Sequence, residues 1–154
     1  MAISMSLRQY LDDHQIHYDV IQHRRTNTAY DTARTTHVPV ERMVKGVLLQ
    51  DKFGYLLAAI PANTEVDLEW VEIKTGRQMA LADENDLAII FSDCDFGAVP
   101  ALGEAFGLNT LWDEQLMMEP EYYLEAGDHE ELIHLNHYQY IELLDENNCG
   151  PIAH

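Results

Sequence analysis

The feature that most constrains the fold of this chain is a pair of short apolar runs, Val44–Gln50 and Tyr55–Ile60. The segment between them, Asp51-Lys52-Phe53-Gly54, has the polar and glycine content of a tight turn. Because apolar runs of this length bounded by turn residues are typical of buried strands, the pattern predicts a hairpin inside a sheet. We therefore expect the rest of the chain to pack around that hairpin.

Short helical and extended patterns alternate on both sides of the hairpin. Helices are expected from a cap at Ser4 or Ser6 to near His14, and over residues 29–36, 67–75, 83–90 and 138–144. Further strands are expected over residues 18–22, 78–81, 108–112, 122–125 and 132–135. This order predicts an α/β (α+β) fold with a mixed, curled central sheet flanked by helices.

The length of the chain favours a single compact domain, since 154 residues fall within the usual domain size of roughly 100–200. The core is expected over residues 23–144, and the polar segment 145–154 is expected to fray. Cys94 and Cys149 do not form a CxxC pair, so we expect no disulfide framework and a cytoplasmic protein. The first residues do not resemble a secretory signal, and no apolar run reaches the roughly 20 residues of a membrane span.

Charge is distributed unevenly along the sequence. The net charge is -18, but all nine Lys and Arg residues lie at or before Arg77, where ten acids bring the sum to -1. Residues 78–154 hold seventeen acids and no Lys or Arg, which gives -17. Only the first half is therefore expected to face a phosphate backbone, and we expect no DNA binding. The cations available for phosphate contacts are Arg24, Arg25, Arg34, Arg42 and Lys45.

Neither serine nor cysteine has the surroundings of a catalytic nucleophile. No G-x-S-x-G elbow surrounds any serine, which argues against a serine hydrolase. Cys94 lies between Asp93 and Asp95, whose charges disfavour a thiolate and predict a raised pKa. The sequence therefore favours a structural role for this thiol.

Eight histidines are available as metal ligands, and the best candidates are His129 and His134. They resemble the zinc helix H-E-x-x-H with one residue too many. A spacing of five places two side chains roughly 140° apart around a helix, so they cannot bind one ion from the same face. A pair formed by His134 and His137 stays open, but an alternating strand typically exposes its polar residues. We predict no metal site.

Lys45 is the only charge between Arg42 and Asp51, and it stands at the opening of an apolar strand. A charged group beside a buried strand needs a partner or a path to water. Lys45 therefore either extends to the surface or reaches into a cleft, where it would hold an anionic group of a substrate.

The loop from Phe91 to Gly103 is rich in glycine and contains Pro100. Its glycines lack dinucleotide-binding spacing, and the chain has no G-K-[ST] sequence. Backbone N–H groups exposed by glycines can nevertheless stabilise the charge that develops on a carbonyl oxygen during ester hydrolysis. An ordinary tight turn explains the same residues equally well.

Several short motifs follow one another between His23 and Leu144. They are Thr28-Ala29, Val38-Pro39 before Glu41-Arg-Met-Val-Lys45, Ile60-Pro61-Ala62, Val66-Asp67-Leu68, Leu81-Ala82 and Asp93-Cys94-x-x-Gly97-Ala-Val-Pro100. In this order and spacing they resemble the YbaK/prolyl-tRNA-synthetase-associated editing domain family. The resemblance implies a YbaK-like fold and a metal-independent, cofactor-free deacylase that hydrolyses the ester of mischarged tRNA.

The resemblance also implies roles for particular residues. The lysine that matches Lys45 holds the 3′-terminal nucleotide, while the substrate's own hydroxyl activates the water. Gly97 matches the glycine of the loop that cradles the aminoacyl carbonyl, and Thr28 matches a pocket position. His129 matches a histidine that lies near the substrate in part of the family. The remaining candidates are Ala98, Val99 and Pro100 in the substrate loop and the four arginines 24, 25, 34 and 42 as tRNA contacts.

Two positions depart from the family pattern. Ala101 follows Pro100 where family members usually have another proline, and Gly46 follows Lys45 where some members have a polar residue. Because a site can change without a change of fold, the competing hypothesis is a non-catalytic member. Such a protein would bind a nucleotide, a tRNA 3′ end or a protein partner. The amino acid removed is expected to depend on pocket shape, since one methylene is worth only about 1–3 kcal/mol.

Overall fold

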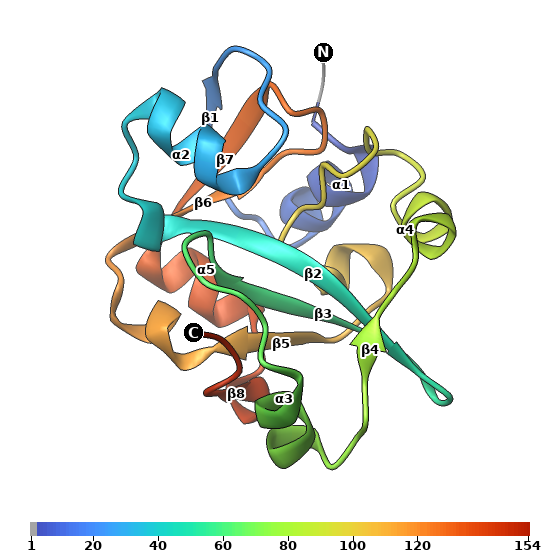
Figure 1. The fold of residues 1–154 in the computed structure, drawn as a ribbon. Coiled ribbons are helices and arrows are strands. Elements are labelled where there is room, and N and C mark those ends of the chain that lie inside the picture. Colours follow the sequence, from blue (N-terminus) through green and yellow to red (C-terminus); the bar gives the residue numbers. More distant parts are fainter. Residues whose placement is uncertain (1–2) are drawn as a thin grey trace.

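The computed structural model describes residues 3–154 (Figure 1). The helices are α1 (Met5–Asp13), α2 (Ala29–Thr36), α3 (Leu68–Thr75), α4 (Glu84–Ile90) and α5 (His137–Leu143). The strands are β1 (Asp19–Gln22), β2 (Met43–Asp51), β3 (Gly54–Pro61), β4 (Ala80–Leu81), β5 (Thr110–Asp113), β6 (Glu121–Glu125), β7 (Glu131–Asn136) and β8 (Cys149–Gly150). Short 3-10 turns lie at Val40–Arg42, Gly103–Phe106, Glu114–Met118 and Glu146–Asn148.

The strands form one mixed sheet in the order β1-β7-β6-β2-β3-β5-β8, and β4 pairs with β2 outside this path. The hairpin of β2 and β3 lies at its centre, in register from Val44 opposite Pro61 to Asp51 opposite Gly54. β2 runs parallel to β6, and β3 runs parallel to β5. The predicted hairpin and the mixed α/β fold class are therefore confirmed.

Side chains alternate between the two faces of the sheet, and helices cover both. On one face, Leu7 and Leu11 of α1 and Tyr140 of α5 pack into the largest apolar cluster. On the other face, Ala33 of α2 packs with Met43, and Val71 of α3 belongs to a separate cluster. No helix within residues 3–154 is long and apolar enough to cross a bilayer.

The segment 145–154 is ordered in the fold, so the expectation that it frays is wrong. β8 pairs in parallel with β5, and both Ile152 and Ala153 are buried. The Asp113 carboxylate accepts hydrogen bonds from the N–H groups of Ile152 (3.0 Å) and Ala153 (3.2 Å). The sequence does not predict this anchor because a two-residue strand has no periodic pattern and its partner lies far along the chain.

β2 changes its neighbour halfway along its length. Met43 and Val44 pair with β6, whereas Leu49 and Gln50 pair with β4. Residues 45–47 therefore pair with β3 but with neither β6 nor β4, and the Leu48 carbonyl accepts a hydrogen bond from the Ala82 N–H at 3.0 Å. The loop that contains Val99 and Ala101 lies against this stretch. At Gly46 an added Cβ would lie 3.1 Å from Val99 Cγ1 and 3.4 Å from the Ala101 Cα, so glycine permits this close approach.

Candidate functional site

A cavity of about 230 Å³ lies where β2 loses its second neighbour. Four separate segments form its wall: Asn27, Thr28, Ala29 and Thr32; Met43, Val44, Lys45 and Gly46; Gly97, Ala98 and Val99; and Glu125 with His129. Six of the candidate residues from the sequence therefore meet here, namely Thr28, Lys45, Gly97, Ala98, Val99 and His129. Thr28 also caps α2, because its side chain accepts a hydrogen bond from the Asp31 N–H.

Lys45 reaches this cavity from the stretch of β2 that pairs with β3 alone. Its side chain is 22% exposed, and its Nζ lies 3.4 Å from Oε1 of Glu65. The Glu65 side chain is 87% exposed, so water competes with this ion pair and the pair is weak. The Lys45 ammonium is therefore available to an anionic group of a ligand.

The loop of residues 95–100 supplies backbone donors to the wall. Gly97 has a φ of +78°, a conformation that side chains disfavour, so glycine is favoured at this position. The Ala98 N–H donates to the Asp95 carbonyl at 2.9 Å. The N–H groups of Gly97 and Val99 have no hydrogen-bond partner within residues 3–154. Because both residues line the cavity, these two N–H groups are candidates to bind an oxygen there.

Pro100 and Ala101 lie behind the wall rather than in it. Pro100 is buried and does not line the cavity, so the structure does not bring it together with the other candidates. Ala101 is fully buried in the large apolar cluster, and its carbonyl accepts a 2.6 Å hydrogen bond from the Tyr140 hydroxyl. The departure from the family proline therefore falls in the core.

His129 lies in a tight turn between β6 and β7. The turn contains Gly127 (φ +119°), and His129 itself has a φ of +63°. The His129 Nε2–H donates to the Phe96 carbonyl at 2.6 Å, which leaves Nδ1 as the acceptor of the neutral ring. This bond ties the turn to the loop that carries Gly97.

Sequence reasoning missed Glu125, the last residue of β6. Its side chain lines the cavity although the residue is only 9% exposed. Burial raises the pKa of Glu125, while hydrogen bonds from the backbone N–H groups of His129 (2.5 Å) and Gly127 oppose that rise. The sequence did contain one signal: Glu125 stands at the end of a predicted strand, between Leu124 and Ala126. An acid between apolar residues of a buried strand is uncommon.

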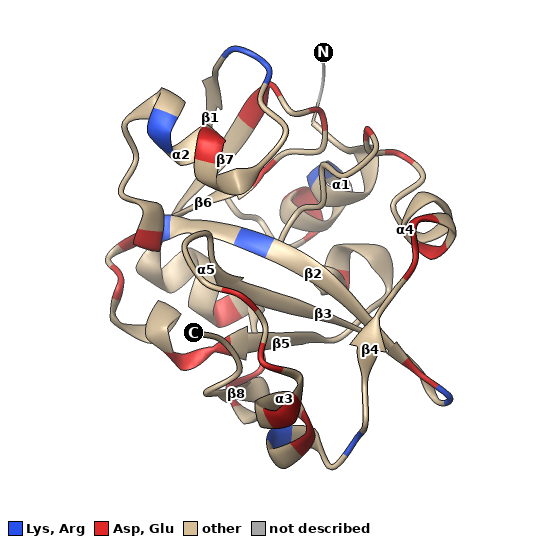
Figure 2. Ribbon diagram, viewed as in Figure 1, with Lys and Arg blue, Asp and Glu red and all other residues tan. Residues whose placement is uncertain are grey.

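A second hollow of about 620 Å³ adjoins the cavity and shares Asn27 with it. It is lined by Arg24, Arg25, Thr26, Asn27, Asp31, Arg34 and Thr35, and we call it the arginine groove. Figure 2 shows basic residues on the loop between β1 and α2 and on α2 itself. The Arg25 guanidinium donates two long hydrogen bonds, to the Asp95 carboxylate and to the Asp128 carbonyl (3.5 Å each), and the Arg25 and Asp95 side chains are substantially exposed.

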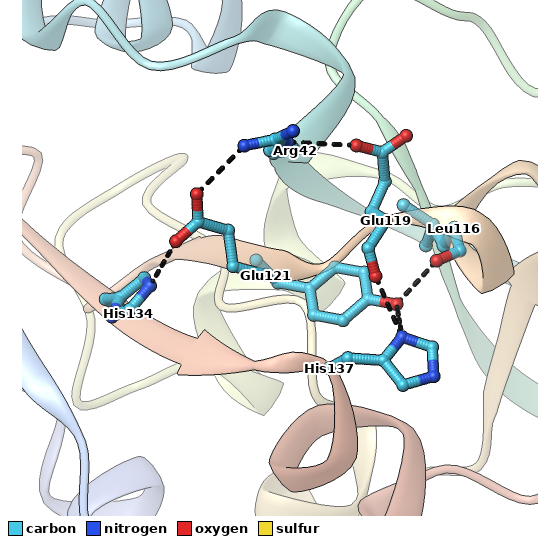
Figure 3. Close-up of polar contacts among 7 residues, drawn as sticks. Arg42, Leu116, Glu119, Glu121, His134 and His137 are labelled. Atoms are coloured by element: carbon cyan, nitrogen blue, oxygen red, sulfur yellow. Dashed lines mark hydrogen bonds and ion pairs between the residues drawn. The ribbon is translucent and has the colours of Figure 1, made fainter.

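Arg42, the fourth predicted tRNA contact, does not line this groove. Its guanidinium bonds Glu119 at 3.1 Å and Glu121 at 2.9 Å, and Glu121 also bonds His134 at 2.8 Å (Figure 3). We call these four residues the Arg42 cluster. Acids of the second half thus lie beside cations of the first half, because β2 pairs with β6. The charge asymmetry of the sequence does not separate into two faces.

The remaining residues considered for catalysis or metal binding are Cys94, His129 and His134. Burial raises the pKa of the Cys94 thiol to about 12, and the Asp93 carboxylate adds to the rise. The predicted direction is therefore confirmed, with burial as the larger cause. His129 and His134 lie in different environments, and within residues 3–154 no three His, Cys, Asp or Glu side chains gather as a metal site would require.

Comparisons with known proteins agree with this geometry. The profile of the aminoacyl-tRNA editing domain matches residues 23–143. No curated protein matches the chain significantly. Among solved structures, a hypothetical protein aligns at 15% identity over 97% of this chain and 99% of that chain, with a TM-score of 0.83. A candidate trans-editing enzyme for prolyl-tRNA synthetase aligns at 19% identity over 98% and 96%, with a TM-score of 0.84.

The same fold also occurs as part of a longer protein. A candidate signal transduction protein from Marinobacter aquaeolei aligns at 19% identity, with a TM-score of 0.76. The alignment covers 96% of this chain but 30% of that one. These structural likenesses establish the fold, and the profile match extends over most of the sequence. The chain belongs to the aminoacyl-tRNA editing domain family.

Proposed function

We propose that this protein is a deacylase that hydrolyses the ester of mischarged aminoacyl-tRNA in the cavity beside β2. The observation that carries the proposal is the convergence of Lys45, two unpaired backbone N–H groups and His129 on one small cavity. Family membership supports the same chemistry. We place the activity in the cytoplasm, where tRNA is charged and used.

The substrate enters with its single-stranded 3′ end. Lys45 holds the 3′-terminal nucleotide, and its weak pair with Glu65 opens to allow this contact. The arginine groove adjoins the cavity at Asn27 and receives phosphates of the preceding nucleotides. Because few cations are available, most recognition comes from the 3′ end inside the cavity.

The reaction needs stabilisation of the developing oxyanion more than a protein nucleophile. Water attacks the carbonyl carbon, the ester C–O bond breaks, and the products are the free amino acid and the tRNA hydroxyl. The N–H groups of Gly97 and Val99 donate to the carbonyl oxygen as it gains charge. The neighbouring hydroxyl of the substrate activates the water. Neither Cys94, with its raised pKa, nor a metal ion takes part in the proposed step.

The competing function, a non-catalytic binder, draws on the altered loop after Pro100. Ala101 lies in the core, so the change leaves the wall of the cavity intact. The altered loop therefore gives no support to the binder over the deacylase.

The test is incubation with mischarged tRNAs, with Ala, Cys or Ser esterified to the proline acceptor and Cys or Ser esterified to the alanine acceptor, while ester loss is followed. Hydrolysis of at least one substrate, insensitive to chelators and to Cys94→Ser, supports the proposal. Binding of the same tRNAs without ester loss would instead identify a binder.

A further inference from the structure

Two charged residues line the cavity on neighbouring strands without bonding each other. Lys45 follows Val44 on β2, and Glu125 follows Leu124 on β6, directly beyond the last paired position of these strands. The Lys45 ammonium pairs with the exposed Glu65 instead. Within residues 3–154 no lysine, arginine or histidine forms an ion pair with Glu125.

The Glu125 carboxylate is nevertheless held firmly in place. The backbone N–H of His129 donates to its Oε1 at 2.5 Å, and the turn that provides this donor is itself fixed to Phe96. A buried carboxylate without an ion-pair contact is costly. Burial raises the pKa of Glu125, and the backbone hydrogen bond and nearby charge of His129 offset only part of that rise. A cationic group of a ligand in the cavity would offset that cost.

We propose that Glu125 binds the free α-ammonium group of the aminoacyl ester and so restricts the site to aminoacyl esters. The inference rests on the proposed function, in which Lys45 takes the nucleotide and the loop N–H groups take the carbonyl oxygen. The polar group left on such a substrate is the α-ammonium, one carbon from the carbonyl. N-acylation removes its charge and adds bulk to a cavity of about 230 Å³. Esters of N-acylated amino acids, including peptidyl-tRNA, are therefore rejected.

The experiment compares a hydrolysed aminoacyl-tRNA with its N-acetyl derivative. Wild type prefers the free amine by about 10–100-fold in kcat/KM, the scale of one hydrogen bond to a charged group. Glu125→Gln keeps an oxygen for the two backbone donors but loses the charge. It lowers kcat/KM for the free amine by that factor and leaves the N-acetyl substrate unchanged. Glu121→Gln, the matched control on the same strand, retains the wild-type preference.

Two results would overturn the inference. One is equal hydrolysis of both substrates by wild type. The other is an equal loss on both substrates in Glu125→Gln, which would assign the carboxylate to the reacting ester.

A binding assay separates this inference from the proposed hydrolysis. The probes are an adenosine with an amide-linked 3′-alanyl group and its N-acetyl derivative, neither of which carries a cleavable ester. If no tRNA is deacylated, tighter binding of the free amine by wild type and its loss in Glu125→Gln still support the role of Glu125. Equal binding of the two probes by wild type contradicts it.

Discussion

The parallel strands β2 and β6 carry charges at both ends of their short contact, and the two ends differ. Beside their first residues, Arg42 and Glu121 bond each other at 2.9 Å, and both have further partners in the Arg42 cluster (Figure 3). A few residues on, Lys45 and Glu125 share no ion pair, and Lys45 holds only an exposed carboxylate. The same strands therefore contain one pair of charges that bond each other and one pair that do not.

The difference teaches which charges hold the fold and which are available to a ligand. The charges of the Arg42 cluster are paired with one another within the protein, so removing one of them is expected to lower stability. Charges that line a cavity without close partners contribute little to stability and can contribute to binding. The comparison thus predicts opposite consequences for similar substitutions at the two ends.

The largest expected effect is that of Lys45→Ala. Loss of this contact to the reacting end of the substrate lowers kcat/KM at least about 100-fold. The melting temperature barely changes, because the Glu65 partner is exposed. Deacylation kinetics and thermal unfolding check both statements, with Lys52→Ala in the exposed turn as the control. Undiminished activity in a folded Lys45→Ala protein would remove Lys45 from the mechanism.

Gly97→Ala should lower activity about tenfold, because alanine disfavours the positive φ at this position and the loop that carries the N–H donors relaxes away from it. Gly107→Ala is the matched control: both glycines have nearly the same positive φ, +78° and +77°, but Gly107 lies outside the cavity wall. Each substitution costs about 1–2 kcal/mol of stability. Equal activity losses in the two variants would trace the effect to backbone strain alone.

Charge reversal of Arg24 and Arg25 should raise KM several-fold and flatten its salt dependence, while kcat stays nearly constant. These arginines line the open groove, whereas Arg42 is already neutralised by two glutamates. Arg42→Gln is therefore expected to leave the salt dependence unchanged. The proposed docking face would be contradicted if the double variant kept the wild-type KM. A strong change of KM on reversal of acids between residues 113 and 131 would then place the tRNA on the other side.

The smallest effects concern stability and differ in sign. The His134 and Arg42 partners lower the pKa of Glu121 below its ordinary 4.5, so its stabilisation is present above that pH and lost as pH falls through the lowered value. Burial raises the pKa of Glu125, so stability is lost as pH rises from 4.5 through the raised value. At pH 7, Glu121→Gln should lower the melting temperature by a few degrees, and Glu125→Gln should leave it unchanged or raise it. Two decreases of equal size would contradict the comparison.

Much of the fold was predictable because its signals are local. Thr28 caps α2, and the turn after Asp51 closes the central hairpin as expected. The predicted strand over 78–81 shrinks to Ala80–Leu81, since only these residues reach β2. The anchoring of residues 149–153 was missed because it depends on the Asp113 carboxylate, 39 positions before Ile152.

The site was predictable only in part, for the same reason. Lys45, Gly97 and His129 stand in motifs that resemble a family, and they meet in the cavity. The environment of Glu125 and the pairing of Arg42 follow from the contact of β2 with β6, which joins residues about 80 positions apart. No periodicity or spacing in either segment predicts the pairing of β2 with β6.

The interleaved sheet also has a consequence for the order in which the chain can fold. Asp19 in β1 contacts His134 in β7 across 115 positions, and the cavity wall draws on four segments between residues 27 and 129. Non-local strand pairing of this kind requires loop closure before any contact stabilises it, so folding is expected on a timescale of roughly milliseconds to seconds. A nascent chain that stops before residue 129 contains β6 but lacks His129 and β7, the strand that lies between β1 and β6. Under the proposed function, a ribosome-bound fragment of that length is expected not to deacylate tRNA, and activity is expected only after both ends of the sheet have been synthesised.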